Sequence, residues 1–399
     1  MKKIKGGVCA PQGFLASGIS SGVKQSGRKD LSLIVSDVPA TLAAVFTKNK
    51  VKPAPVLISH KNAKSGVAQV IITNSGNANC ATGPQGLKDA KRMVAIVAKE
   101  LSIPEKRVLV TSTGVIGKPL KMDKIIPGIK KVVRKLSYRG SNSAAEAILT
   151  TDTFKKEIAV EVEVGDQKFS IGGIAKGSGM IHPNMATMHA FITTDAKISH
   201  SKLQKMLKAA TEDTFNMISV DQDTSTSDCV FVLANGLSGV NVEKSSATLK
   251  KFETALHAVC EYLAKEIARD GEGATKLITV TVKGAATKNC ARLAAREITT
   301  SPLVKTAIYG EDPNFGRIIA SLGASGVDIN PDKVDIKVQG VTLLKNGVGQ
   351  VKNMGKAAKK LKAKEVAIDI DLKSGKNEAV AWGCDLTYGY IKINARYHT

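Results

Sequence analysis

Two short apolar runs flank one amphipathic segment in the first third of the chain, and this arrangement constrains the fold more than any other feature. Residues 69–72 and 108–110 have the length and apolar character of buried strands. Residues 74–79 form a polar loop after the first strand, and Pro104 ends the helix that follows. The helix has its apolar residues on one face: Leu87, Ala90, Val94, Val97, Ala98 and Leu101. This order of strand, loop, helix and strand predicts a mixed α/β fold.

The second of these strands brings small polar residues to its carboxyl end. Residues 111–114 read Thr-Ser-Thr-Gly and follow the apolar run directly. In α/β proteins, ligands often bind at the carboxyl ends of strands. We therefore expect residues 111–114 to take part in a site.

The remaining helices and strands are predicted from the spacing of apolar residues and from the turn-forming residues between them. Alternating or apolar runs predict strands at 157–164, 189–193, 229–233, 277–282, 366–372 and 389–393. Helical spacing predicts one helix over 203–210, capped by Ser199, and a longer one over 249–267. Glycine-rich residues 170–180 and polar residues 314–317 are expected to be loops.

Length and composition describe a soluble globular protein. The 399 residues allow two domains or one large layered domain, and 43% of them are hydrophobic. No apolar stretch approaches the roughly 18 residues of a membrane span, and the N-terminus lacks the apolar run of a signal peptide. We expect no membrane association and a cytoplasmic location. The six cysteines lack metal-binding spacing, so no metal site is expected.

The formal net charge of +23 raises the alternative of a nucleic-acid-binding protein. The basic residues, however, are spread along the chain. The cluster of Lys130, Lys131, Arg134 and Lys135 alternates with apolar residues at helical spacing, as on the solvated face of a helix. No aromatic residues are interleaved to stack on bases. We therefore expect no nucleic-acid partner.

The common catalytic fingerprints are absent from the sequence. The chain has no phosphate-binding P-loop, no dinucleotide-binding glycine motif, no H-E-x-x-H and no G-x-S-x-G. Its six histidines provide no recognisable catalytic triad. A nucleophile in this chain would need activation by another group.

One segment combines several unusual features. Residues 172–188 read GGIAKGSGMIHPNMATM, a glycine-rich approach followed by a Pro-Asn turn and a threonine that enters a strand. Read alone, the segment is typical of a surface loop that leads into a strand. A cleavable Ala186–Thr187 bond is the alternative, and local chemistry does not decide between the two.

The segment resembles the self-cleavage loop of the ornithine acetyltransferase family, also called glutamate N-acetyltransferases, whose pattern is K-G-S-G-M-I-x-P-N-M-A-T-M. Other segments similar to the family follow in the same order along nearly the whole chain. They are residues 46–49, 74–79, 112–117, 150–153, 223–226, 270–276, 310–314 and 393–399.

The resemblance implies a layered α/β sandwich of the ornithine acetyltransferase type, similar to the N-terminal-nucleophile fold. It also implies autocatalytic cleavage between Ala186 and Thr187 into fragments 1–186 and 187–399. The first fragment would carry the oxyanion loop and the second would begin with the nucleophile Thr187. A threonine hydroxyl needs a base, and the new α-amino group of Thr187, with a reference pKa of about 8, would supply one.

The same resemblance implies the reaction and its residues. An acetyl group would pass from N-acetylornithine to Thr187 and then to glutamate, a ping-pong transfer in arginine biosynthesis. Thr113 and Gly114 would form the oxyanion hole, because a hydroxyl and a closely approaching backbone N–H are suitable donors. The substrate contacts implied are Thr153, Lys176, Thr187, Glu272, Asn394 and Thr399. We expect a heterotetramer of two α and two β fragments and no cofactor, with acetyl-CoA as a second donor left open.

Three positions depart from the family pattern. His189 stands where leucine is common, Phe315 where tryptophan is common and Gln222 where glycine is common. We expect His189 to be neutral and hydrogen-bonded, although its place near Thr187 leaves a part in proton transfer open. A related self-cleaving aminopeptidase is the alternative enzyme, in which water would take the acyl group instead of glutamate.

Overall fold

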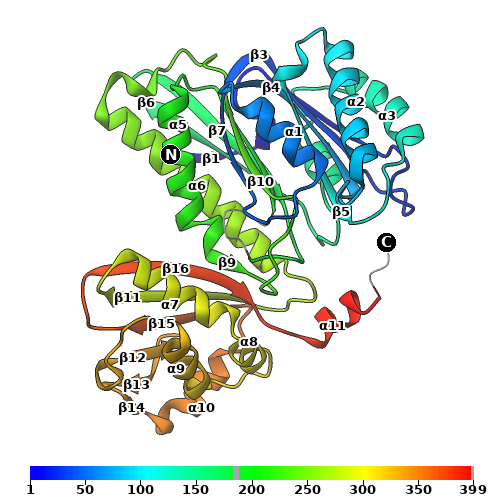
Figure 1. The fold of residues 1–399 in the computed structure, drawn as a ribbon. Coiled ribbons are helices and arrows are strands. Elements are labelled where there is room, and N and C mark those ends of the chain that lie inside the picture. The colour runs from blue at the N-terminus through cyan, green and yellow to red at the C-terminus, as the bar shows by residue number, and fades with distance from the viewer. Residues whose placement is uncertain (183–187, 397–399) are drawn as a thin grey trace.

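The computed structural model describes residues 1–182 and 188–396 of the chain, and its strands form two sheets (Figure 1). The larger sheet has the order β1-β6-β7-β8-β10-β3-β4-β5, with β2 paired to β3 as well. Its strands are β1 (Lys2–Ile4), β2 (Phe14–Ile19), β3 (Leu31–Phe46), β4 (Val67–Asn77), β5 (Val108–Val115), β6 (Lys156–Val164), β7 (Gln167–Lys176), β8 (His189–Thr194) and β10 (Cys229–Ala234).

The smaller sheet is built from the C-terminal part of the chain and one short earlier strand. Its order is β14-β13-β12-β15-β11-β16-β9. The strands are β9 (Ile218–Ser219), β11 (Leu277–Ala285), β12 (Asp335–Val338), β13 (Val341–Lys345), β14 (Val348–Gly349), β15 (Glu365–Asp371) and β16 (Asn377–Cys384). Helices α7 (Lys288–Thr300), α8 (Pro302–Tyr309), α9 (Phe315–Ala324) and α10 (Met354–Lys360) belong to this part.

Helices cover the larger sheet and join it to the smaller one. Helices α1 (Ala54–Ala63) and α2 (Gly83–Leu101) lie beside β5 (Figure 1). Helix α3 (Met122–Arg134) packs against α2, β2 and β3, and α4 (Ser141–Ala147) also packs on β2 and β3. Helix α5 (His200–Asp213) packs on β3, and α6 (Ser246–Arg269) contacts β6 and β7 of one sheet and β9 and β16 of the other. The apolar side chains of α6 therefore belong to one core that continues across both sheets.

The predicted layered α/β fold is confirmed, and most of its elements lie where periodicity placed them. Helices α2, α3 and α6 present the predicted apolar faces to the core. Strands β6, β8, β10, β11 and β15 agree with the predicted runs to within a few residues. Ser199 occupies the position before α5, but its side chain makes no capping hydrogen bond.

Residues 170–180 are not a loop throughout, because 170–176 belong to strand β7. The glycines there serve close packing. A Cβ atom on Gly172 would lie 1.8 Å from the carbonyl oxygen of Gly7, and one on Gly173 would lie 3.0 Å from Leu263 Cδ1. The glycine content thus permits close approach to a buried strand instead of marking a turn.

Residues 389–393 are helical and not a strand, since α11 spans Tyr388–Asn394. The Thr387 hydroxyl accepts a hydrogen bond from the Gly389 N–H at 3.0 Å and donates one to the Gly273 carbonyl at 2.7 Å. This helix cap, together with its hydrogen bond to Gly273, outweighs the strand propensity of the alternating sequence.

Two further loop predictions are corrected in the same way. Asn314 caps α9 by accepting from the Arg317 N–H at 3.1 Å, so residues 315–317 form the first helical turn. Residues 74–77 continue strand β4, and β5 likewise extends to Val115. The parallel register pairs Ser75 with Thr113 and Gly76 with Gly114, which gives the predicted site residues a rigid support.

Strands β7 and β8 are antiparallel neighbours, with Lys176 paired to His189. Residues 177–188 connect these two strands, so the Ala186–Thr187 bond belongs to a connection inside the larger sheet. Fragments 1–186 and 187–399 would share that sheet through β7–β8 and β3–β10 pairing. In the described part of the chain, no helix is long and apolar enough to cross a membrane.

Candidate active site

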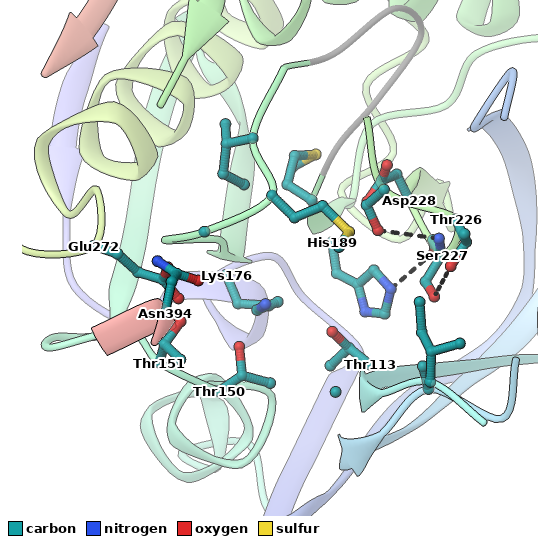
Figure 2. A pocket seen from close by; sticks show the side chains of 18 residues that line it. Thr113, Thr150, Thr151, Lys176, His189, Thr226, Ser227, Asp228, Glu272 and Asn394 are labelled. Carbon is teal, nitrogen blue, oxygen red and sulfur yellow. Dashed lines mark hydrogen bonds between the residues drawn. The ribbon is translucent and has the colours of Figure 1, made fainter. Parts of the chain in front are cut away.

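A pocket opens at the ends of β5 and β7 and the start of β8, next to the connection between the last two strands (Figure 2). Residues of that connection line it, among them Ile181 and Met188. The other described lining residues are Ala78, Thr113, Gly114, Ile116, Thr150, Thr151, Lys176, Gly179, Met180, His189, Ser225, Thr226, Ser227, Asp228, Glu272 and Asn394. Five predicted site residues from distant parts of the sequence therefore meet in one pocket.

Thr113 and Gly114 lie where β5 ends against β4. Gly114 has a φ of +131°, and a Cβ atom there would lie 2.4 Å from the carbonyl carbon of Gly76. Only glycine fits this conformation and this approach of two backbones. Thr113 is 9% exposed, so its hydroxyl lies at the pocket wall in a largely water-excluded place. Hydrogen-bond donors so placed are strongest toward a developing negative charge.

Lys176 brings a positive charge to the same pocket. It ends β7, is 7% exposed, and its Nζ lies 4.0 Å from Asp152 Oδ2. In the view of Figure 2, its side chain lies beside the Glu272–Asn394 pair and above Thr150. A buried ammonium at this separation from its counter-ion keeps donor capacity for a second anion, such as a substrate carboxylate.

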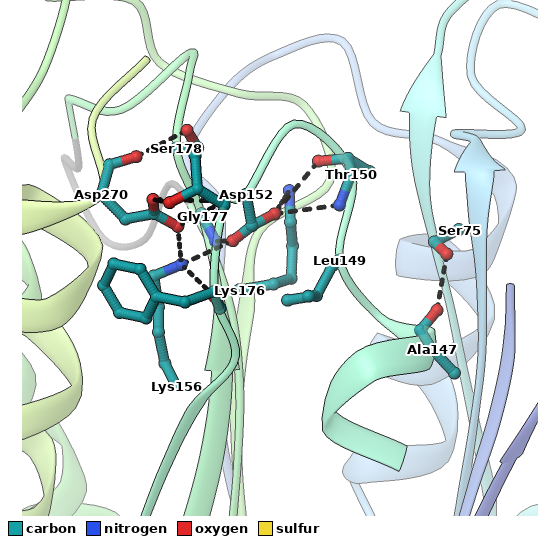
Figure 3. A network of polar contacts seen from close by, with 12 residues as sticks. Ser75, Ala147, Leu149, Thr150, Asp152, Lys156, Lys176, Gly177, Ser178 and Asp270 are labelled. Atoms are coloured by element: carbon teal, nitrogen blue, oxygen red, sulfur yellow. Dashed lines mark hydrogen bonds and ion pairs between the residues drawn. The ribbon is translucent and has the colours of Figure 1, made fainter. Parts of the chain in front are cut away.

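Lys176 adjoins a buried network of ion pairs (Figure 3). Lys156 Nζ lies 2.8 Å from Asp152 Oδ1 and 2.5 Å from Asp270 Oδ2. Burial alone would raise the pKa of Asp152, but the adjacent Lys156 and Lys176 cations hold that pKa well below its usual value. Asp152 is therefore a carboxylate at neutral pH and a counter-ion to Lys176.

The same network fixes the backbone that approaches the Ala186–Thr187 bond. Asp152 accepts from the Gly177 N–H at 2.7 Å, and the Ser178 hydroxyl donates to the Asp270 carbonyl at 2.6 Å. Asp221 accepts from the N–H groups of Met180, at 2.6 Å, and Ile181, at 2.8 Å. Gly177, Met180 and Ile181 are thus held by aspartate side chains from other segments, and Ser178 by the Asp270 carbonyl.

Glu272 and Asn394 form the wall opposite Thr113. Asn394 Nδ2 donates to Glu272 Oε2 at 2.8 Å, which ties helix α11 to the 270–276 segment. A Cβ atom on Gly179 would lie 2.3 Å from the Glu272 carboxyl group, so glycine is needed at 179 for that contact. Glu272 supplies the pocket with an acceptor for a cationic substrate group.

Two buried polar atoms of the pocket have no hydrogen-bond partner among the described residues, Nδ1 of His189 and Oδ2 of Asp228. His189 uses its other ring nitrogen, with Nε2 3.0 Å from the Ser227 carbonyl oxygen. Burial, together with nearby Lys176, lowers the pKa of His189 to about 3, and burial raises the pKa of Asp228 well above its usual value. Unpaired buried polar atoms are uncommon in native proteins and cluster at functional sites.

Comparison with known proteins shows the family to which the chain belongs. The model of the ArgJ family matches residues 15–399. An arginine biosynthesis bifunctional protein ArgJ from Symbiobacterium thermophilum is 50% identical, with 100% of both chains aligned. The chain belongs to the ArgJ family. The family predicted from the sequence motifs is therefore confirmed.

Other members of the ArgJ family are similarly close. The ArgJ bifunctional protein of Bacillus anthracis is 50% identical over 99% of this chain and 97% of its own. The crystal structure of ArgJ from Bacillus halodurans is 48% identical and covers 46% of this chain and 97% of that one, with a TM-score of 0.44. An ornithine acetyltransferase from Mycobacterium tuberculosis, solved in complex with ornithine, is 39% identical over 47% of this chain and 98% of that one, with the same TM-score.

The predicted site residues divide into three groups. Thr113, Gly114, Lys176, Glu272 and Asn394 line the pocket. Thr153 does not line it, because its hydroxyl donates to Asp270 while Thr150 and Thr151 form the wall. Ala186, Thr187 and Thr399 lie outside the described residues, and their roles stay predictions.

The departures from the ArgJ family pattern have physical explanations. Gln222 has a φ of +67°, the left-handed conformation that favours glycine, and its side chain donates to the Thr300 carbonyl at 2.7 Å. Phe315 packs against the core, and a Cβ atom on Gly349 would lie 2.7 Å from its ring. His189 is buried and hydrogen-bonded, as expected, and its lowered pKa makes it neutral at pH 7.

Sequence reasoning missed the roles of several residues of the ArgJ pocket. Thr226, Ser227 and Asp228 line it, and Lys156 and Asp270 form the ion network. The run D-T-S-T-S-D at 223–228 was a signal, because small polar residues before a strand often line a site. No spacing rule joins Lys156 to Asp270, which are 114 residues apart.

We expect His189→Leu to make the free energy of unfolding less dependent on pH in the acid range. The variant should leave kcat nearly unchanged. Between about pH 3 and about 6.5 the unfolded chain binds a proton at His189 that the folded chain does not, so stability falls as pH falls through this window. Urea unfolding at several pH values measures the effect, with His257→Gln, at a half-buried position of α6, as control. A folded His189→Leu protein with kcat reduced about 100-fold would instead make His189 a catalytic base.

Proposed function

We propose that this chain transfers the acetyl group of N-acetylornithine to glutamate in arginine biosynthesis, through an acetyl ester on Thr187 formed after cleavage of the Ala186–Thr187 bond. The observation that carries the proposal is the lining of the pocket. Met188, the residue after Thr187, lies in one wall together with oxyanion donors, a buried lysine and a buried carboxylate. Membership of the ArgJ family, whose relatives are named as arginine biosynthesis bifunctional proteins, supports the same reaction.

Maturation needs no group from outside the chain except water. Thr187 Oγ attacks the carbonyl carbon of Ala186, and the C–N bond breaks as the ester forms. The Thr187 nitrogen leaves as an amine. Water then hydrolyses the ester, which leaves a carboxylate on Ala186 and restores the hydroxyl. The hydrogen bonds that fix residues 177–181 support this step, because an attack of this kind requires a constrained backbone.

Turnover repeats the same chemistry on a substrate. Thr187 Oγ attacks the acetyl carbon of N-acetylornithine while the α-amino group of Thr187 takes the hydroxyl proton. That proton passes to the departing ornithine nitrogen as the amide C–N bond breaks. The amine of glutamate then attacks the ester, and Thr187 regains its proton. Thr113 and Gly114 stabilise the negative oxygen in each tetrahedral intermediate.

The charges of the pocket match the two substrates. Both are amino-acid derivatives with an α-carboxylate, and Lys176 is the buried cation that would bind it. N-acetylornithine also carries a side-chain ammonium, which suits Glu272 on the Asn394 side. Glutamate has a carboxylate at the corresponding end. Glu272 therefore distinguishes the donor from the acceptor.

Glu272→Gln should reduce kcat/KM for N-acetylornithine by roughly 10- to 100-fold, the cost of losing one contact between charged groups, about 1.5–3 kcal/mol. The KM for glutamate should change less, because no ammonium of glutamate needs that carboxylate. Steady-state kinetics with each substrate varied in turn measures both values. Glu253→Gln, at a half-buried position of α6 far along the chain from Glu272, is the matched control. An equal loss for both substrates would contradict the assigned role.

The acceptor of the acetyl group distinguishes the proposed transfer, in which it is glutamate, from hydrolysis, in which it is water. Purified protein should convert N-acetylornithine and glutamate to ornithine and N-acetylglutamate, with little ornithine released when glutamate is omitted. Rapid release of ornithine without glutamate would favour the aminopeptidase class. Transfer requires no cofactor in this scheme, and the described residues contain no group of three or more side chains suited to a metal ion.

The two fragments should stay together after cleavage. Strand β7 of the first fragment pairs with β8 of the second, and β3 pairs with β10, so their hydrogen bonds continue across the cut. We infer that the active enzyme contains both fragments, as two copies of each in a heterotetramer.

A further inference from the structure

A cavity lined by β3, α1 and α5 lies apart from the active-site pocket and shares no described lining residue with it. We call it the β3 cavity. It has a volume of about 470 Å³, a size typical of sites for small organic molecules. Six of its lining residues decide its chemistry: Ala44, Phe46, Lys52, Leu57, Gln204 and Lys208. The proposed acetyl transfer uses none of them.

The end of strand β3 has an open edge at this cavity. Strand β3 pairs with β4 only as far as Thr41, whereas its pairing with β10 continues to Phe46. Gln204 of α5 replaces the missing strand at Ala44. Its Oε1 accepts from the Ala44 N–H and its Nε2 donates to the Ala44 carbonyl, both at 3.0 Å. A side-chain amide thus completes this edge at one residue only.

Phe46 is the next residue whose backbone faces the open edge. In an antiparallel pair, the hydrogen-bonding groups of alternate residues face the partner strand. The Thr47 N–H donates to the Asp228 carbonyl at 3.0 Å, so Thr47 faces β10. Phe46 therefore faces away from β10, on the same edge as Ala44. Among the described residues, none accepts a hydrogen bond from the Phe46 N–H, which leaves this donor to a ligand in the cavity.

Two lysines bring positive charge to the β3 cavity. Lys52 lies two residues before α1, and Lys208 lies on α5. Neither ammonium group forms an ion pair or a hydrogen bond with another described residue, and none of the described lining residues is acidic. Both groups therefore keep all their donors for a ligand. Together they favour a molecule with two negative groups.

The rest of the cavity wall is apolar. Leu57 of α1 is 51% exposed and lines the cavity together with Val56 and Phe46. The Phe46 ring meets the ring of His60 edge to face, with 5.2 Å between the ring centroids. Exposed apolar groups of this kind can bury a methyl group or a ring of a ligand.

These features together define the class of ligand. Lys52 and Lys208 suit two carboxylates, and the Phe46 N–H suits a carbonyl oxygen. The apolar wall suits an acyl group. A free amino acid fits less well, because its ammonium would add positive charge beside the two lysines. An N-acylated dicarboxylic amino acid has both carboxylates, an amide carbonyl and an acyl group, and it carries no cation.

Residues 46–49 connect the β3 cavity to the active-site pocket. Thr47 lines the cavity, and its hydroxyl donates to the Ser225 carbonyl at 2.9 Å. Asn49 Nδ2 donates to the Thr224 carbonyl, also at 2.9 Å. Ser225 in turn lines the active-site pocket. A ligand that fixes the end of β3 therefore acts on a segment that holds one wall of the active site.

We propose that the β3 cavity is an effector site for an N-acylated dicarboxylic amino acid, and that its occupancy changes the affinity of the active site through residues 46–49. N-acetylglutamate is the effector that this chemistry selects. Its choice rests on the proposed function, because that reaction releases N-acetylglutamate, whereas the class of ligand follows from the cavity alone. The coupling is reciprocal, since each ligand changes the affinity of the other by the same factor.

Calorimetric titration of the purified enzyme with N-benzoylglutamate tests the site. This compound has the same carboxylates and amide, and its larger acyl group suits the 470 Å³ cavity better than the active-site pocket of about 150 Å³. In the double variant Lys52→Glu and Lys208→Glu, its Kd should rise at least about tenfold. Lys356→Glu with Lys359→Glu, at two exposed positions of α10, changes the net charge equally and should leave the Kd unaltered.

Two competing compounds test the class of ligand. N-acetylglutamate should displace N-benzoylglutamate from the wild type. N-benzoylglutamine, which lacks one carboxylate, should bind more weakly than N-benzoylglutamate. Absence of binding to the wild type, or equal affinity of the wild type and the double variant, would overturn the inference. Failure of N-acetylglutamate to displace the probe would overturn its assignment as the effector.

Ornithine serves as the active-site ligand in the test of coupling, because its ammonium groups disfavour the β3 cavity. Saturating N-benzoylglutamate should change the Kd of ornithine by roughly fivefold or more in the wild type and should not change it in the double variant. Binding of the probe without this change would overturn the effector role. Binding and coupling in an enzyme that transfers no acetyl group would refute the proposed function and leave the effector site standing.

Discussion

Thr187→Ala should leave one uncleaved chain of 42.1 kDa and abolish acetyl transfer from N-acetylornithine. Removal of the hydroxyl eliminates the nucleophile of both reactions, and the intact peptide bond also withholds the α-amino base. Loss of a covalent nucleophile with its base commonly costs roughly 10⁶-fold in kcat. A denaturing gel and a transfer assay on the same preparation measure both effects.

Thr187→Ser is the matched variant, because it keeps a hydroxyl at the same position. It should be cleaved, if more slowly, and should retain measurable transfer. If Thr187→Ala were still cut at residue 186, or if it transferred acetyl groups at the wild-type rate, the nucleophile would have to be another residue.

Thr113→Ala should lower kcat by roughly 10²–10³, as expected for loss of one oxyanion donor, while the KM values change little. Thr113 lines the pocket beside Gly114, whose positive φ and close contact with Gly76 fix the end of β5. The hydroxyl therefore acts from a rigid support and stabilises charge only after attack has begun. Steady-state kinetics with N-acetylornithine and glutamate measures the effect.

Two variants control for structural damage at this position. Thr113→Ser keeps the donor and should retain most of the activity. Thr111→Ala, two residues earlier on the same strand, loses the 2.8 Å hydrogen bond with Thr73 outside the pocket. That loss should cost about 1 kcal/mol of stability without a large change in kcat. If Thr113→Ala had an unchanged kcat, the oxyanion assignment would be wrong.

The fold was predictable where one local signal dominated. Helices such as α2 and α6 carry long apolar stripes, and alternation marked β6, so periodicity placed them correctly. Prediction failed where packing between distant segments decided the conformation. Gly172 lies in strand β7, where the nearby Gly7 backbone leaves no room for a side chain. Helix α11 begins where Thr387 caps it and binds Gly273.

Those residues of the candidate site that belong to sequence motifs could be predicted. Thr113, Lys176, Glu272 and Asn394 belong to separate motifs, and folding gathers them into one pocket. The ion network of Asp152, Lys156 and Asp270 was not predictable, since its members are ordinary charged residues that meet only after folding. Burial also lowers the pKa of His189 and raises the pKa of Asp228, which sequence alone does not report.

The position of the predicted cut explains how a cleaved chain keeps its site. The bond lies between two paired strands of one sheet, so cleavage would free a terminus without separating the walls of the pocket. Lys176 would end the last strand of the first fragment and His189 would begin the first strand of the second. The new N-terminus would directly precede Met188, which lines the pocket.

The mass of the active wild-type protein under denaturing conditions, with N-terminal sequencing, tests the central claim most directly. We predict two chains, residues 1–186 and 187–399, with the second beginning at Thr187. A single intact chain of 42.1 kDa that is fully active in acetyl transfer would contradict the proposal that Thr187 becomes a terminal nucleophile.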